Sequence, residues 1–249
     1  MAQPGGATAA VVTGHTRGLG AAIAADLLSR GVRVLGIARR ANAELAQRHG
    51  AALSEVQLDL GDPTALVRWL ETDALELFLG RAGTALLVNN AGIVQPTGPL
   101  QAQDVATVAR AVALNVGAPL MLCAAFVAAG QDATDRRILH ISSGAGRNAY
   151  AGWSVYCATK AALDHHARAV ALDRTSALRI SSVAPGVIDT DMQAEVRATS
   201  DDLLPGRQRF VAMKREGRLL SPERAGHAVV ELLLSDDFGD DPVADVRPR

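Results

Sequence analysis

Short runs of apolar and β-branched residues alternate along the chain with longer stretches in which apolar positions recur every three or four residues. The short runs predict six β-strands, at 9–13, 32–38, 54–59, 84–89, 136–142 and 178–184. The longer stretches predict helices near 19–30, 42–49, 63–79, 102–130, 153–174 and 222–234. The strands are apolar on both faces, as expected when helices cover both sides of a parallel sheet. The pattern therefore predicts an α/β fold with a doubly wound parallel sheet.

The predicted elements form one continuous series, without an internal repeat, a low-complexity run or a Pro/Ser-rich linker. We therefore expect residues 1–249 to form a single domain, with loose ends at 1–6 and about 239–249. The stretch 186–221 interrupts the rhythm between the sixth strand and the last helix and is rich in charged residues. A connection this long in a compact domain is usually functional, so we expect a lid on the substrate side.

Composition excludes several classes of protein. The chain is 49% apolar and 20% charged, which suits a packed core, and its net charge of −1 provides no basic surface for nucleic acid or an anionic membrane. The N-terminal residues lack the features of a signal peptide, and both cysteines, Cys123 and Cys157, lie in apolar segments, which favours a reduced cytoplasmic compartment.

The uncharged stretch 111–131 is long enough to span a bilayer, but polar and helix-breaking residues interrupt it. We expect it to pack against the sheet or another subunit of a soluble protein.

Three glycines, Gly14, Gly18 and Gly20, connect the first predicted strand to the first predicted helix. Glycine allows a tight turn and lets the backbone approach a pyrophosphate at the helix N-terminus. Many strand-to-helix turns use glycine without binding anything. After the first strand of a doubly wound sheet, however, this loop predicts dinucleotide binding and a Rossmann fold.

Tyr156 is one of only two tyrosines in the chain and precedes Lys160 by four residues. On a helix this spacing places the phenol and the ammonium on one face. The pair is either an ordinary surface contact or a phenol whose pKa an adjacent cation lowers for proton transfer. The surrounding motifs favour proton transfer.

These motifs resemble the short-chain dehydrogenase/reductase family over about residues 8–190. Asn90-Ala91-Gly92 follows the fourth strand, Asn115 lies in the next helix, and Ser143 precedes Tyr156 by thirteen residues. The segment "YCATK" matches the family's Tyr-x3-Lys, and Pro185-Gly186 follows the sixth strand.

The resemblance implies a catalytic set of Asn115, Ser143, Tyr156 and Lys160. In the family the lysine contacts the nicotinamide ribose and lowers the pKa of the tyrosine. The tyrosine donates a proton to the substrate carbonyl oxygen as hydride reaches the carbon. Ser143 would orient the carbonyl, and Asn115 would help to hold a water that relays protons to Lys160.

Charges near the second strand indicate the cofactor. An acidic residue at its end would bind the ribose 2′-hydroxyl of NAD, but here Arg39 and Arg40 follow the strand, and Arg17 lies in the glycine loop. Arginines bind a 2′-phosphate well, so we expect NADP(H), although Arg40 fits a surface charge equally well. Asp59-Leu60 fits the adenine-contacting pair, but a helix-capping Asp would look the same. The residues expected to bind the cofactor are Gly14, Thr16, Arg17, Gly18, Leu19, Gly20, Arg39, Arg40, Asp59, Leu60, Asn90, Ala91, Gly92, Tyr156, Lys160, Pro185, Gly186, Val187, Ile188 and Thr190.

The segments "GWSVYCATKAALD" and "APGVIDTDMQ" and a later K-x-x-G-x-L are similar to sepiapterin reductases and bacterial benzil reductases. The resemblance implies an NADPH-dependent reductase of α-dicarbonyl compounds that acts as a homodimer, with a tetramer as the alternative. The expected substrate residues are Ser143, Trp153, Tyr156, Met192 and Asp245, of which Asp245 could equally be a solvated acid in a frayed tail. The competing hypotheses are a 3-oxoacyl or broad-range ketone reductase, and a noncatalytic NADPH-binding sensor.

We expect no metal site. His165 and His166 follow Lys160 on the same predicted helix, without further metal ligands at a suitable spacing in the sequence. Histidines on the helix surface are the simpler explanation.

Overall fold

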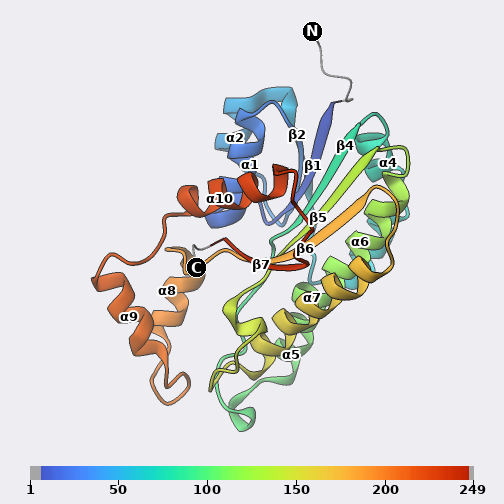
Figure 1. Ribbon diagram of the computed structural model, residues 1–249. Coiled ribbons are helices and arrows are strands. Elements are labelled where there is room, and N and C mark those ends of the chain that lie inside the picture. Colours follow the sequence, from blue (N-terminus) through green and yellow to red (C-terminus); the bar gives the residue numbers. More distant parts are fainter. Residues whose placement is uncertain (1–6, 247–249) are drawn as a thin grey trace.

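The computed structural model describes residues 7–246, so the loose end expected at 1–6 lies outside the described residues. Seven parallel strands form one sheet in the order β3-β2-β1-β4-β5-β6-β7 (Figure 1). The strands are β1 (Thr8–Thr13), β2 (Arg33–Ala38), β3 (Leu53–Gln57), β4 (Thr84–Asn89), β5 (Asp135–Ile141), β6 (Leu178–Ala184) and β7 (Val243–Asp245). The strand order reverses direction between β1 and β4, and ligands of open α/β sheets bind at such a switch point.

Helices cover both faces of the sheet, as the apolar strands predicted. One core lies between the sheet and α1 (Gly18–Ser29), α2 (Ala43–His49) and α10 (Pro222–Leu234). The other lies under α3 (Pro63–Leu70), α4 (Ala74–Leu79), α6 (Ala118–Ala129) and α7 (Ser154–Leu172). Figure 1 shows these two layers on opposite sides of the strands.

Several helices begin where a side chain accepts a hydrogen bond from a first-turn N–H. Asn42, Asp62, Thr190 and Ser221 cap the helices that follow them in this way. Helix α1 differs, because its N-cap residue is Arg17, whose side chain makes no such bond. The side chain of its N-cap residue thus leaves the first N–H groups of α1 open to an anion.

Two predicted helices are interrupted. The helix expected at 63–79 breaks between α3 and α4, where the Thr72 hydroxyl bonds to the carbonyl of Trp69 and accepts from the N–H of Ala74. The helix expected at 102–130 begins with η2 (Leu100–Ala102) and α5 (Val105–Val112), widens into the five-residue π turn η3 (Ala113–Gly117), and continues as α6.

The run Val105–Ala129 is long and apolar enough to cross a membrane by length and composition alone. Its inner residues Leu122, Cys123 and Phe126 are buried in the core beside the sheet. Packing of this kind is characteristic of a core helix, in agreement with the position expected from the sequence.

The tail expected to be loose from about 239 is ordered through Val246. Residues Val243–Asp245 form β7, which pairs in parallel with the outer edge of β6. The N–H of Ser182 donates to the carbonyl of Pro242, and the N–H of Val246 donates to that of Ala184. The prediction was wrong here because unpaired backbone groups on β6 order a segment too short to show strand periodicity.

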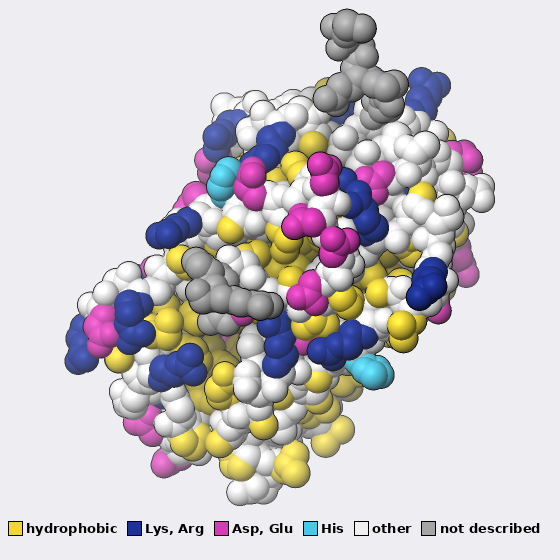
Figure 2. Space-filling model, in the orientation of Figure 1, with side chains coloured by type: hydrophobic (Ala, Val, Ile, Leu, Met, Phe, Trp, Pro, Cys, Tyr) yellow, Lys and Arg dark blue, Asp and Glu magenta, His cyan; other side chains and the backbone are white. Residues whose placement is uncertain are grey.

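The stretch 186–221 holds two helices, α8 (Asp191–Ala198) and α9 (Arg207–Arg215), and closes with a parallel bridge between Ile188 and Leu220. Its inner side chains pack with Trp153 and Tyr156 in a third, smaller core. Lys and Arg side chains gather over the outside of α9 (Figure 2). Most of them are paired with acids, as in Arg207–Asp201 and Lys214–Asp189.

Gly152, two residues before α7, packs against Leu203 of this segment. Its φ is +81°, and a Cβ there would lie 2.2 Å from the carbonyl oxygen of Leu203. We expect Gly152→Ala to destabilise the protein by at least ~2 kcal/mol more than Gly31→Ala, measured by urea unfolding. Gly31 is the matched control because its φ is +79° but its added Cβ meets nothing within 4 Å. Equal losses for the two variants would contradict close packing between Gly152 and Leu203.

Candidate active site

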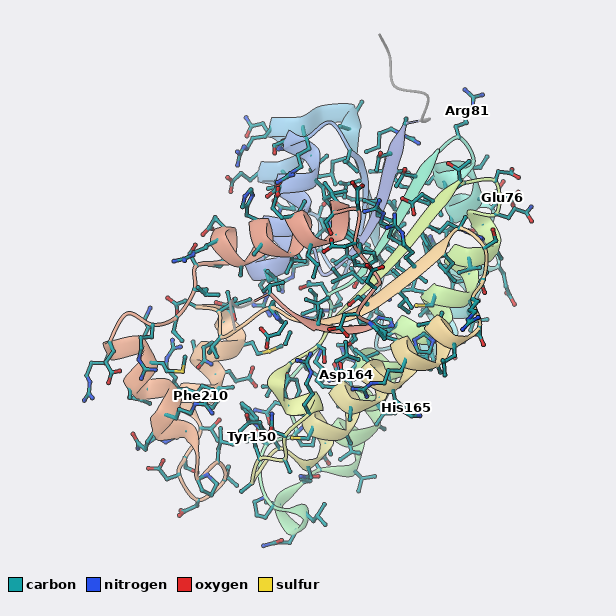
Figure 3. All side chains as sticks on the ribbon, in the orientation of Figure 1. Glu76, Arg81, Tyr150, Asp164, His165 and Phe210 are labelled. Atoms are coloured by element: carbon teal, nitrogen blue, oxygen red, sulfur yellow. The ribbon has the colours of Figure 1, made fainter. Side chains whose placement is uncertain are left out.

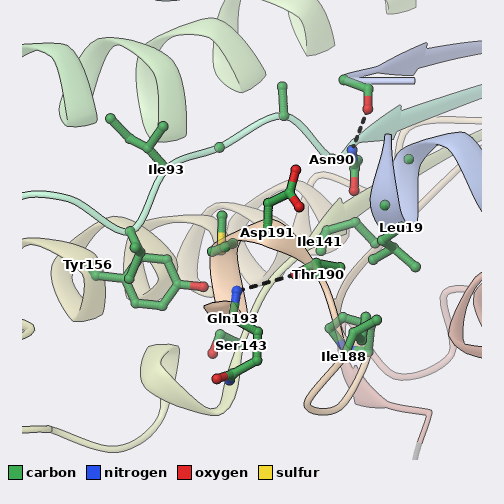
Figure 4. Close-up of a pocket in the computed structure, with 18 of the residues that line it drawn as sticks. Leu19, Asn90, Ile93, Ile141, Ser143, Tyr156, Ile188, Thr190, Asp191 and Gln193 are labelled. Atoms are coloured by element: carbon green, nitrogen blue, oxygen red, sulfur yellow. Dashed lines mark hydrogen bonds between the residues drawn. The ribbon is translucent and has the colours of Figure 1, made fainter. Parts of the chain in front are cut away.

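The carboxyl ends of the strands surround a cavity of ≈ 1060 Å³ that extends from the glycine loop to α9. It is lined by every residue expected to bind cofactor and by four of the expected substrate residues, Ser143, Trp153, Tyr156 and Met192. Figure 4 shows part of this lining, with Tyr156 at the left and Asn90 and Leu19 at the right. Two expected site residues, Asn115 and Asp245, are not among the described lining residues.

The glycine loop is held in a close turn. A Cβ on Gly20 would lie 2.2 Å from the carbonyl oxygen of Gly14, so only glycine fits there. The Asn90 amide donates to the carbonyls of Thr13 (2.9 Å) and Gly14 (3.3 Å) and braces the loop (Figure 4). The side chain of Asn90 thus supports the cofactor loop from below, while the N-terminus of α1 faces the cavity.

His15 was not recognised from the sequence. Its ring is fully buried against Gly36, and its Nε2 lies 2.6 Å from the carboxylate of Glu55, which also accepts from the N–H of Asn42 (2.6 Å). This contact ties the glycine loop to β3 and to the start of α2. A single His in a glycine loop gives no sequence signal for such a role.

Three of the four expected catalytic side chains come from two neighbouring segments. Ser143 follows β5 as the N-cap of the turn η4 (Gly144–Gly146), and its Oγ accepts from the N–H of Ala145 at 3.2 Å. Tyr156 and Lys160 share one face of α7, as the spacing predicted. The Tyr156 phenol and Ser143 line the same cavity, and the Lys160 Nζ lies 5.7 Å from the centroid of the tyrosine ring.

The expected lowering of the Tyr156 pKa is not seen. Burial raises the pKa of this phenol to about 12, and the hydrogen bond with Ser143 offsets only part of the effect. The Lys160 Nζ instead donates to the carbonyl oxygen of Ile141 at 2.7 Å. Burial lowers the pKa of Lys160 to about 8, with a partial offset from the negative charge of Asp164. At neutral pH the phenol is therefore protonated, and the lysine is mostly charged.

Asn115 lies in the π turn η3 and is buried behind the site. Its Oδ1 accepts from the N–H of Ile93 at 2.9 Å, and its Nδ2 donates to the Ile93 carbonyl at 2.8 Å. A Cβ on Gly92 would lie 3.1 Å from the Asn115 Oδ1 and 3.9 Å from the Lys160 Nζ. Asn115 thus fixes the backbone next to Lys160, and the wider turn brings its side chain there.

Arg17, Arg39 and Arg40 are exposed at the end of the cavity next to β2, where we expect the adenosine ribose of a dinucleotide. The Arg17 side chain pairs with Asp191 at 2.7 Å, and both side chains are more than two-thirds exposed. A solvated pair of this kind is weak, so Arg17 can exchange Asp191 for a phosphate at little cost.

Asp59 lines the same end of the cavity, but its carboxylate is already engaged. It accepts from the N–H of Gly61 at 2.9 Å and pairs with Arg110 at 3.0 Å. Burial alone would raise the pKa of Asp59, but these two partners outweigh burial and hold the pKa below its ordinary value. The side chain therefore orders the loop that would contact an adenine.

Aromatic residues form the opposite end of the cavity. The Trp153 ring lies 5.5 Å from Tyr156, 5.5 Å from Phe210 and 5.8 Å from Tyr150, measured between centroids. Tyr150 and Phe210, labelled in Figure 3, belong to the same small hydrophobic core as Trp153. The sequence identified Trp153 alone, because Phe210 is separated from it by more than fifty residues and reaches it only through α9. The wall suits a flat, apolar substrate beside the phenol.

Asp245, the expected pterin anchor, lies on β7. Its carboxylate is 3.8 Å from the Arg147 guanidinium, which also donates to the carbonyl of Ala244 at 2.7 Å. Since the described residues lining the cavity do not include it, the structure does not support the expected substrate contact. Asp245 lies at the edge of the sheet because β7 pairs with β6.

In the structure His166 lies near Cys123 and His140, two neighbours that the sequence did not predict. Cys123, His140 and His166 place ligand-type atoms within 4.8 Å of one another, behind the sheet. His140 bonds directly to His166 (3.1 Å) and to Asn89 (3.2 Å), and burial raises the pKa of the Cys123 thiol to about 12. The contacts of His140, together with the bond between Asn89 and the Cys123 Sγ, connect these side chains in one buried polar network.

The parallel sheet, the glycine loop at the switch point and the Ser143, Tyr156 and Lys160 side chains around one cavity define a nucleotide-dependent oxidoreductase. The chain belongs to the short-chain dehydrogenase family, whose model matches residues 8–201. Members of this family bind a nicotinamide cofactor and act on carbonyl or alcohol groups.

Relatives agree with this assignment. The chain is 36% identical to a benzil reductase ((S)-benzoin forming) from Bacillus cereus, over 92% of this chain and 94% of that one. It is 34% identical to the sepiapterin reductase of Meriones unguiculatus, over 94% of each chain. A short-chain dehydrogenase/reductase structure from Burkholderia vietnamiensis is 52% identical with a TM-score of 0.72, covering 96% of this chain and 97% of that one. These findings confirm the resemblance to the benzil and sepiapterin reductase subgroup.

Proposed function

We propose that this protein is an NADPH-dependent carbonyl reductase that reduces α-dicarbonyl compounds, with Tyr156 as the general acid. The observation that carries the proposal is the buried Tyr156 phenol, protonated at neutral pH, which shares the dinucleotide-type cavity with Ser143 and lies beside an aromatic wall. The similarity to benzil and sepiapterin reductases supports the substrate class.

A bound nicotinamide cofactor would supply the hydride. Tyr156 holds the proton that the new alkoxide needs, and Ser143 offers a hydroxyl that orients the carbonyl oxygen beside the phenol. An alkoxide is a stronger base than a phenolate, so transfer from the phenol is downhill even with a pKa near 12. Lys160 places a positive charge near the phenolate that remains.

The residues at the dinucleotide end fit NADPH. Three arginines, Arg17, Arg39 and Arg40, are exposed around this end of the cavity, and Arg17 is the N-cap residue of α1, whose first N–H groups have no side-chain cap. Guanidinium groups bind a 2′-phosphate through charge-assisted hydrogen bonds, and helix N-termini bind pyrophosphate. Two nearby acids are paired, Asp59 with Arg110 and Asp191 with Arg17, whereas Arg39 and Arg40 are in no ion pair among the described residues.

A reductase of 3-oxoacyl thioesters or of ketones in general is the second candidate, because the chain is also 32% identical to a 3-oxoacyl-[acyl-carrier-protein] reductase. NADPH oxidation with benzil, diacetyl, sepiapterin, acetoacetyl thioester and a simple ketone tests the proposal. We expect the highest kcat/KM for benzil or diacetyl. A preference for the thioester would favour the second candidate, and NADPH binding without turnover of any compound would indicate a sensor.

We further propose that the enzyme is a cytoplasmic homodimer. Helices α5 and α7 expose Val105 (82%), Val112 (47%) and Leu172 (80%), and a self-complementary two-fold contact would bury such side chains. We expect light scattering at micromolar concentration to give at least twice the chain mass of 25.9 kDa. Val112→Glu should lower this mass, whereas Val67→Glu, a matched change on α3, should not. A single-chain mass for the unmodified protein would contradict the proposal.

A further inference from the structure

Asp164 is a buried acid that the mechanism above does not use. It follows Lys160 by one turn of α7 and is only 1% exposed. It faces the sheet, whereas its neighbour His165 lies on the outer side of the helix (Figure 3). An ionised carboxylate is costly to bury unless it is paired and hydrogen-bonded, so its surroundings indicate what it does.

The partners of Asp164 come from the segments that build the catalytic site. Its Oδ1 accepts from the hydroxyls of Ser142 (2.6 Å) and Ser182 (2.7 Å), and its Oδ2 faces the Arg147 Nε at 3.4 Å. Ser142 is the residue before Ser143, and Arg147 follows the turn that Ser143 caps. The carboxylate therefore binds both ends of the segment that carries Ser143.

The turn also lies directly against the helix. A Cβ on Gly146 would be 2.7 Å from the Asp164 Oδ2 and 3.1 Å from the Lys160 carbonyl oxygen, so only glycine lets the two segments approach this closely. Arg147 extends the contact to β7 through the carbonyl of Ala244 and the carboxylate of Asp245. One buried acid thus connects β5, β6, α7 and the C-terminal strand.

We propose that Asp164 is a positioning residue that acts on the reaction through Lys160 and through the turn that carries Ser143. Its role rests on the proposed reductase function. Its negative charge lies one helical turn from a buried ammonium, where charges interact more strongly than they do in water. The carboxylate favours the charged form of Lys160 and partly offsets the effect of burial on its pKa.

The other titratable groups around Lys160 do not supply this charge. Tyr156 on the same helix is neutral at physiological pH, because burial raises its pKa to about 12. His140 on β5 is also neutral, because burial, and then the charges of His166 and Lys160, lower its pKa to about 3. Arg147 is cationic, contacts Asp164 and supplies no negative charge. Among the described groups, Asp164 is therefore the one that supplies a negative charge to Lys160.

The chain allows a direct test, because Lys160 and Lys214 are its only lysines. Protein labelled with ¹³C at lysine Cε gives two lysine signals, which Lys214→Arg assigns. Titration of the Lys160 signal then measures its pKa without turnover. We expect a pKa near 8 in the unmodified protein and a value about one unit lower in Asp164→Asn.

Two further variants separate charge from structure. Arg147→Gln removes the cation that opposes Asp164 and should shift the Lys160 pKa upward. Ser182→Ala removes one hydrogen bond to Asp164 but no charge, and should leave the Lys160 pKa unchanged while lowering stability. General loosening of the site would not shift the pKa in opposite directions in Asp164→Asn and Arg147→Gln, so the pair remains informative even if one variant folds poorly.

The same variants link the charge to the reaction. In the unmodified protein kcat/KM should fall as pH rises through about 8, because Lys160 loses its proton there. In Asp164→Asn this fall should begin about one pH unit lower, and in Ser182→Ala it should not move. Identical Lys160 pKa values in the unmodified protein and Asp164→Asn would overturn the proposal, as would a shifted pKa with an unshifted activity profile. Failure of the proposed function is separate, since it appears as absent turnover in the unmodified protein, where the NMR titration still reports on Asp164.

Discussion

Tyr156→Phe is expected to lower kcat for a diketone by at least about 100-fold, the usual contribution of a general acid. The substitution removes the phenolic proton and leaves the ring packed against Trp153. NADPH binding, measured by calorimetry, should change little, because the expected phosphate contacts lie at the other end of the cavity.

Tyr150→Phe is the matched control. Tyr150, the other tyrosine of the chain, lines the same cavity and also contacts Trp153, but it has no contact with Ser143 or Lys160 among the bonds described. It should retain most of the unmodified kcat. Comparable losses in the two variants would mean that losing either hydroxyl impairs the site, and that the Tyr156 proton has no special role in the rate.

Arg39→Asp is expected to lower the preference for NADPH over NADH, expressed as the ratio of kcat/KM values, by about 10- to 100-fold. Hydrogen bonds to charged groups contribute about 1.5–3 kcal/mol, and the new carboxylate adds repulsion of the 2′-phosphate. Arg39 is exposed where β2 ends and lines the cavity, so the substitution should not disturb packing.

Arg48→Asp makes the same charge change on α2, outside the cavity lining, where Arg48 pairs weakly with Glu44 at 3.5 Å. Its cofactor preference should match that of the unmodified enzyme. If the unmodified enzyme already prefers NADH, the assignment of the arginines is wrong, whatever the two variants do.

The sheet and the catalytic helix could be predicted because their signals are local. The strands β1, β2 and β4 are buried along almost their whole length, and each of β1 to β6 was predicted to within two residues at either end. Tyr156 and Lys160 share a face through helical spacing alone. The resemblance of the surrounding motifs also identified Ser143 before its position in space was known.

Features that depend on distant partners could not be predicted. The π turn at Asn115 accompanies a bond to Ile93, and β7 forms because it pairs with β6. Within "AALDHH", Asp164 looks like a surface acid, and only folding brings Ser142 and Ser182 to it. The Tyr156 pKa depends on burial and on the neighbouring Ser143 side chain, neither of which follows from the spacing of Tyr156 and Lys160.

The central claim is that this site transfers hydride from NADPH to one carbonyl of an α-dicarbonyl compound. The most direct measurement uses NADPH deuterated at nicotinamide C4 with benzil, followed by mass spectrometry of the product at short reaction times. The account predicts benzoin that carries one deuterium on its carbinol carbon, at a rate that Tyr156→Phe lowers by at least about 100-fold. Tight NADPH binding without formation of a deuterated α-hydroxyketone from benzil or diacetyl would contradict it.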